Sequence, residues 1–123
     1  MPLTPVAPPG GAGESPRVPL ARLALDAALA VPGVLGGEVD AAGVRATTDP
    51  EAGLLRGVSV ISEGDGRYAV ALRLVARVVP LPELGDEVRR RVQRRARREG
   101  LEECLGTVSV EIARVLVPEE GDS

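Results

Sequence analysis

Arginine is the residue type in this chain with the clearest capacity for binding chemistry, because seven arginines fall within ten consecutive positions. They are Arg89, Arg90, Arg91, Arg94, Arg95, Arg97 and Arg98. A guanidinium group stays charged at any physiological pH, and its planar fork matches a carboxylate or a phosphate. All 15 cationic residues of the chain are arginine, yet its 18 acidic residues give it a net charge of -3. The cluster is therefore a basic segment within an acidic protein, which predicts a binding surface for an anionic partner.

A solvated helix face is the ordinary alternative to a binding surface. Asp86 and Glu87 precede Arg89, Arg90 and Arg91 by three or four residues, and this order of acid before base suits both side-chain pairing and the helix dipole. We expect these two acids to neutralise only the first half of the segment. In the second half, arginines three or four residues apart repel one another by about 0.2 to 0.5 kcal/mol per pair. Both interpretations stay open on the sequence alone.

Three anionic partners fit such a surface. The first is a second copy or another protein subunit, since acidic residues such as Glu102, Glu119 and Glu120 could meet the arginines. The second is anionic lipid, which would be contacted peripherally because the segment lacks large apolar residues for insertion. The third is nucleic acid, which a single aromatic residue, Tyr68, disfavours. The candidate partner-binding residues are Arg90, Arg91, Arg94, Arg95, Arg97 and Arg98, together with Arg73 and Arg77.

Catalytic chemistry is not expected. The chain has no histidine and one cysteine, Cys104, which excludes Ser-His-Asp and Cys-His arrangements and a cysteine-histidine zinc site. Glu102 and Glu103 are neighbours in sequence instead of facing each other across a cleft. We therefore expect no catalytic residue, no metal and no cofactor. A lone cysteine fits a reducing compartment, and no stretch approaches the roughly 20 apolar residues that span a bilayer, so we expect a cytoplasmic protein.

The elements that would position the arginines can be read in order along the chain. Residues 1–19 contain six prolines and are expected to form a disordered tail. Apolar residues then recur at helical spacing from Leu20 to Val31, before Pro32-Gly33 ends the pattern. Glycines interrupt residues 34–55, where we expect one short strand at Gly43–Thr47.

A strand hairpin and a second helix follow. Strands are expected at Gly57–Ile61 and Tyr68–Val79, joined by a loop at 62–67. Alternation places Tyr68, Val70, Leu72, Leu74, Ala76 and Val78 on the core face of the second strand, with Arg73 and Arg77 on the other face. The arginine helix is expected from Pro82 to the residue before Gly100, with a buried stripe of Leu84, Val88, Val92 and Ala96. Gly85 inside it suggests either a close backbone approach or simple tolerance.

These elements predict one α+β domain over residues 20–117, in which two helices pack on one face of a three- or four-stranded mixed sheet that contains a central β-hairpin. A last strand is expected at 108–113, with its pattern blurring towards Val117, and residues 118–123 are expected to form an acidic tail.

In the order and residues of its motifs the chain resembles the alkaline shock protein family, small bacterial envelope stress response proteins. The matching segments are Ala28–Val34, Gly57–Val60, Tyr68–Val79, Pro82-Glu83-Leu84 and Val108–Ile112. The resemblance implies a non-catalytic, cytoplasmic α+β protein that gathers at the inner face of the membrane through a membrane-anchored partner. The expected function is thus a non-enzymatic assembly or scaffold component acting through the arginine-rich helix. A nucleic-acid-binding module using the same helix is the alternative.

Overall fold

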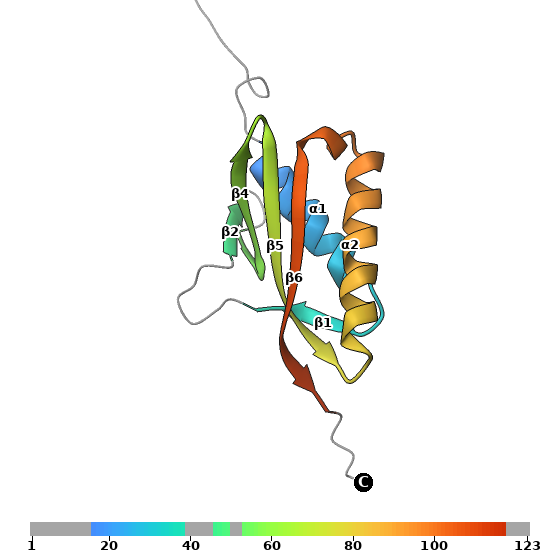
Figure 1. Cartoon of the computed structure of the whole chain (residues 1–123). Coiled ribbons are helices and arrows are strands. Elements are labelled where there is room, and N and C mark those ends of the chain that lie inside the picture. Colours follow the sequence, from blue (N-terminus) through green and yellow to red (C-terminus); the bar gives the residue numbers. More distant parts are fainter. Residues whose placement is uncertain (1–15, 39–45, 50–52, 118–123) are drawn as a thin grey trace, which may run out of the picture.

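Two helices, a mixed sheet and a separate two-stranded sheet form the part of the chain that the computed structural model describes, namely residues 16–38, 46–49 and 53–117 (Figure 1). The helices are α1 (Arg17–Leu29) and α2 (Leu81–Arg98), and a 3-10 turn, η2 (Glu102–Cys104), precedes the last strand. The strands are β1 (Val34–Gly37), β2 (Ala46–Asp49), β3 (Gly53–Arg56), β4 (Val58–Gly64), β5 (Arg67–Arg77) and β6 (Leu105–Leu116). This confirms the predicted α+β class.

Helix α1 begins earlier than its apolar pattern. Pro16 stands at its N-cap and Pro19 lies within its first turn, where a missing N–H leaves no helical hydrogen bond unmade. Arg17–Pro19 therefore belong to the helix and not to the tail expected over 1–19, of which residues 1–15 lie outside the described residues. The helix ends before Gly33, whose φ of 103° favours glycine.

Strand β5 is the centre of the sheet. It pairs with β4 in an antiparallel hairpin through a two-residue turn at Asp65 and Gly66, which have φ values of 56° and 75°. The loop is thus shorter than the one expected at 62–67. On its other edge β5 pairs in parallel with β6, which returns after α2, so the sheet is mixed as predicted.

Strand β1 was not expected, because its glycines hide the strand pattern. It pairs with the same edge of β5 as β4 does, beyond the point where β4 stops. Val34 pairs with Ala76, and Val58 of β4 pairs with Leu72. At this junction a Cβ atom on Gly57 would lie 2.6 Å from Gly37 Cα and 2.7 Å from Arg73 O. Gly37 and Gly57 therefore allow two strand ends to meet beside one position of β5.

The hydrophobic core lies between the sheet and the two helices, which cover the same face (Figure 1). Val70, Leu72, Leu74 and Ala76 of β5 are buried, as predicted, but Val78 is 60% exposed because β5 ends at Arg77. The short strand expected at Gly43–Thr47 is placed as β2, while residues 43–45 are outside the described ranges. Strand β2 pairs with β3 in a separate two-stranded sheet, and Thr47 Oγ1 donates a hydrogen bond to Val58 O (2.9 Å).

Candidate anion-binding groove

The rotation of α2 about its axis decides where each arginine lies. Its predicted apolar stripe is buried in the structure, at Leu84, Val88, Val92 and Ala96. Residues three and four apart share a helix face, so a fixed stripe fixes the remaining faces. One flank, towards α1, carries Arg91, Arg94, Arg95 and Arg98. Arg90 and Arg97 point away from the stripe, and their side chains are 59% and 64% exposed.

A groove runs between α1 and α2 along the first of these flanks. It has a volume of about 220 Å³ and is lined by Ala27, Ala30, Arg91, Arg94, Arg95 and Arg98. We call it the arginine groove. The two alanines are small enough to leave space between the helices, and the Arg91 Nη1 atom donates a hydrogen bond to Ala30 O (3.5 Å) at the end of α1. The groove thus combines an uncharged floor with four guanidinium groups.

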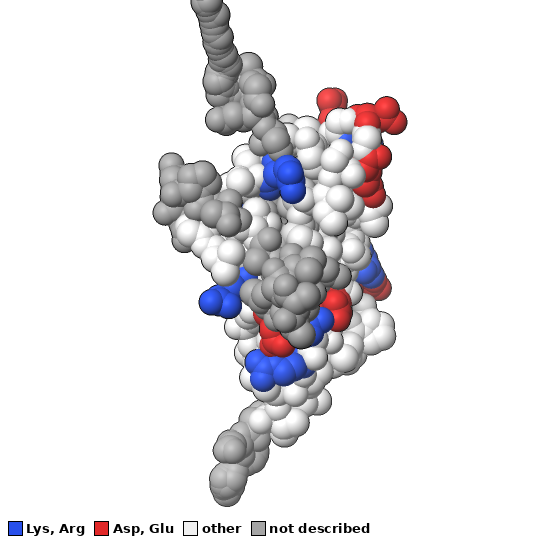
Figure 2. Space-filling view, turned by 90° about the vertical axis from the view of Figure 1, so that its left-hand side faces the viewer, with Lys and Arg blue, Asp and Glu red and all other residues white. Residues whose placement is uncertain are grey.

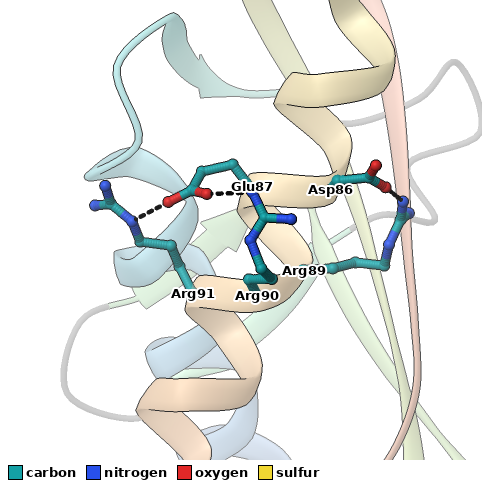
Figure 3. A network of polar contacts seen from close by, with 5 residues as sticks. All are labelled: Asp86, Glu87, Arg89, Arg90 and Arg91. Carbon is teal, nitrogen blue, oxygen red and sulfur yellow. Dashed lines mark hydrogen bonds and ion pairs between the residues drawn. The ribbon is translucent and has the colours of Figure 1, made fainter.

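In the first half of α2 the arginines are neutralised by acids of the same helix (Figure 3). Asp86 pairs with Arg89. Glu87 accepts from Arg90 at 2.6 Å and from Arg91 at 2.8 Å. These hydrogen bonds, that of Arg90 first and that of Arg91 second, hold the pKa of the Glu87 carboxyl below its ordinary value. The expected pairing of the first half is present.

Neutralisation also reaches the second half of the helix, beyond what the sequence suggested. Arg95 Nε donates to Glu99 at 2.8 Å, and Arg95 Nη2 lies 4.0 Å from Asp26 Oδ2 of α1. Arg97 Nε donates to Glu102 at 3.2 Å. Glu99 and Glu102 lie beyond the arginine run, and Asp26 comes from another helix, so charge counting within the run overlooks them.

Two arginines of the groove have no acidic partner in the described part of the chain. Among the described residues, neither Arg94 nor Arg98 makes a hydrogen bond or ion pair with another side chain. They stand one turn apart on the α1 flank of α2. The groove consequently presents two uncompensated cations beside two that already hold a carboxylate.

The two remaining candidates, Arg73 and Arg77, lie elsewhere. Both belong to β5, and Arg73 Nη1 pairs with Glu111 of β6 at 2.6 Å on the sheet face opposite the helices. Arg77 is exposed at the end of β5. The structure therefore does not bring the eight predicted residues onto one surface. Figure 2 shows the side that faces left in Figure 1, where basic and acidic side chains lie next to one another on a mostly uncharged surface.

Sequence reasoning missed the contribution of α1 to this groove. The groove residues of α1 lie far from the arginines in sequence: Ala30 accepts a hydrogen bond from Arg91, 61 positions away. A helical pattern with small residues at its end was visible in the sequence. Which flank of α2 it would meet depends on the packing of both helices against the sheet.

Comparison of the chain with family models, with curated proteins and with solved structures found no match. In the described ranges, no helix has the length and apolar character needed to cross a bilayer. The function is therefore inferred from the geometry of the arginine groove.

Proposed function

We propose that this protein is a non-enzymatic assembly or scaffold component that binds a carboxylate-rich segment of a partner protein in the arginine groove. The observation that carries the proposal is the pair Arg94 and Arg98, which lack an acidic partner among the described residues. Like charges one helical turn apart repel each other. A carboxylate from outside the chain relieves this repulsion and gains charge-assisted hydrogen bonds.

The dimensions of the groove favour carboxylate side chains over larger ligands. Its volume of about 220 Å³ is below the roughly 300 to 1,000 Å³ of most small-molecule pockets. Binders of single-stranded nucleic acid stack bases on aromatic side chains, and the chain has only Tyr68, on β5.

The resemblance to the alkaline shock protein family supports a role in the envelope stress response. In that role the protein would act near the inner face of the cell membrane, recruited through a membrane-anchored partner or through further copies of itself. Direct lipid contact would be peripheral, because the apolar stripe of α2 is buried in the core and cannot enter a bilayer. The partner protein, and not the lipid, therefore supplies the main attachment in this proposal.

A peptide titration tests the groove directly. Fluorescence anisotropy with a labelled glutamate-rich peptide measures the affinity of the full chain and of the double variant Arg94→Ala/Arg98→Ala. Charge-assisted hydrogen bonds contribute about 1.5 to 3 kcal/mol each, so the variant is expected to bind at least about tenfold more weakly.

The matched control is Arg90→Ala/Arg97→Ala, which removes the same charge from two residues of the same helix that do not line the groove. This control is expected to bind within about threefold of the unmodified chain, because Arg90 and Arg97 already pair with Glu87 and Glu102 and do not line the groove. Equal losses in the two double variants would show that charge alone, and not the groove, binds the peptide.

Competing anions belong in the same titration. A single-stranded RNA oligonucleotide and vesicles containing phosphatidylserine serve as probes for the two alternatives. Binding through several phosphates weakens steeply as salt rises. Tighter binding of either probe than of the peptide, with the same dependence on Arg94 and Arg98, would overturn the protein-partner proposal.

A further inference from the structure

The outer edge of β6 is a second surface, separate from the arginine groove. Strand β6 is 12 residues long, or about 40 Å at 3.3 Å per residue. It pairs with β5 along one side, and no other strand of the described part of the chain pairs with its opposite side. An open strand edge presents a row of backbone N–H and C=O groups that another strand can bind.

The usual protection of such an edge is only partial in β6. Proline, charged side chains and β-bulges commonly block edge strands; Leu105–Leu116 contains no proline, and its charged residues are Glu111 and Arg114. Register shifts interrupt its pairing with β5 at two places, but Val108 to Ile112 pair regularly with Val70 to Leu74. Beyond them, apolar side chains are exposed at Val115 (40%), Leu116 (44%) and Val117 (73%).

Strand β6 carries two opposite charges, Glu111 and Arg114, so two antiparallel copies of the strand can present opposite charges to each other. Glu111 pairs with Arg73 and Arg114 with Val75 in the sheet register. Because Arg73 and Val75 are two residues apart on β5, Glu111 and Arg114 share one face of the sheet although they are three residues apart. The extra residue, Ala113, lies at the register shift between them.

We propose that two copies of this chain pair through their β6 edges, antiparallel about a two-fold axis that passes between Glu111 and Arg114. Each Glu111 then faces Arg114 of the second copy, which gives two identical ion pairs, as an isologous interface requires. Within one chain Glu111 bonds to Arg73 and Arg114 Nε bonds to Glu38 (2.7 Å). The side chains remain 49% and 60% exposed, so a second copy can reach both of them.

The dimer joins the two sheets into one continuous sheet and covers the exposed backbone of both edges. It also brings the apolar end of each strand next to the sheet of the other copy. The interface goes beyond the proposed function and does not require it, since the arginine groove lies on the α1 flank of α2 and not on β6. The two proposals can therefore fail separately.

Size-exclusion chromatography with light scattering on the full chain measures the association. The unmodified chain is expected to show twice the mass of one chain at micromolar concentrations and to dissociate on dilution. Glu111→Arg alone and Arg114→Glu alone place like charges opposite each other, so each is expected to raise the dissociation constant at least about tenfold. The double variant Glu111→Arg/Arg114→Glu restores opposite charges across the axis and is expected to restore the dimer.

A thermal melt separates this effect from damage within one chain. The double variant breaks the internal pairs with Arg73 and Glu38, so its monomer is expected to be no more stable than either single variant, although it dimerises better. Arg90→Glu on α2 is the control reversal and is expected to leave the dimer unchanged, as is Arg94→Ala/Arg98→Ala.

Hydrogen exchange provides a test without substitution. Amides of Val108 to Leu116 that point away from β5 are expected to exchange more slowly as protein concentration rises. A mass of one chain at every concentration, or a dimer that neither single reversal weakens, would overturn the proposal.

Discussion

Gly57 and Gly37 lie in backbone contact, so that a Cβ atom on Gly57 would stand 2.6 Å from Gly37 Cα. Gly57 also has a φ of 90°, a backbone conformation that residues with a Cβ atom rarely adopt. The contact is made by backbone atoms, which cannot move aside as the end of a flexible side chain can. The junction between β1, β4 and β5 therefore depends on the absence of side chains at two positions.

Gly57→Ala is expected to lower the free energy of unfolding by about 2 to 4 kcal/mol, because it adds both backbone strain and a steric clash. Chemical denaturation of the full chain measures the change. Gly36→Ala is the matched control in the same strand region, since a Cβ there meets nothing within 4 Å, and its loss is expected to be below about 1 kcal/mol. Equal stability of both variants would show that the junction is not closely packed.

Gly85→Ala is expected to raise the free energy of unfolding by about 0.5 to 1 kcal/mol. Gly85 lies inside α2, where a Cβ atom would meet nothing within 4 Å, so alanine improves helix propensity without a clash. Of the two interpretations of this glycine, tolerance is the one that fits the structure. A denaturation midpoint below that of the unmodified chain would contradict this prediction.

Ala30→Glu is expected to abolish binding of the glutamate-rich peptide while preserving the fold. Ala30 is exposed and lines the arginine groove, so a carboxylate at this position occupies the guanidinium groups from within the chain. Anisotropy titration measures the affinity, and circular dichroism checks the fold. Ala30→Gln, which has nearly the same shape without the charge, should keep most of the affinity; a similar loss in both would point to steric blocking.

Glu87 gives the stability a pH dependence of defined sign. Arg90 and then Arg91 lower the pKa of its carboxyl, and a carboxyl whose pKa falls on folding stabilises the protein above its unfolded pKa. This contribution disappears as pH falls through the lowered folded pKa. The thermal midpoint of the unmodified chain should therefore exceed that of Glu87→Gln at neutral pH, and the difference should vanish in acid. A difference that stayed constant across this range would contradict the assignment.

The sequence was sufficient where periodicity was regular. The spacing of Leu84, Val88, Val92 and Ala96 predicted both α2 and its buried stripe, because a single apolar stripe has only one way to face a core. The alternation from Val70 to Ala76 did the same for β5. Both helices and the mixed sheet followed from these patterns.

The sequence was insufficient where contacts join distant segments. Strand β1 is held by pairing of Val34 with Ala76, and its own residues, Val-Leu-Gly-Gly, carry no strand pattern. Asp26, which pairs with Arg95, belongs to α1, so this contact depends on tertiary structure and charge spacing does not describe it. The pair of Arg95 with Glu99, by contrast, has the four-residue spacing of a helix and could have been read from the sequence.

The partner strands β4 and β6 differ in how far along the chain they lie from β5. The β4–β5 hairpin closes through two residues, whereas β5 meets β6 only after α2, with Arg73 and Glu111 separated by 38 positions. Because distant pairings form later than local ones, we expect the hairpin to belong to the folding nucleus and β6 to dock last, which φ-value analysis of Val60 and Val108 can measure. A strand that joins late leaves apolar surface open during folding, so the slow step of this chain is expected to coincide with its period of greatest exposure to aggregation.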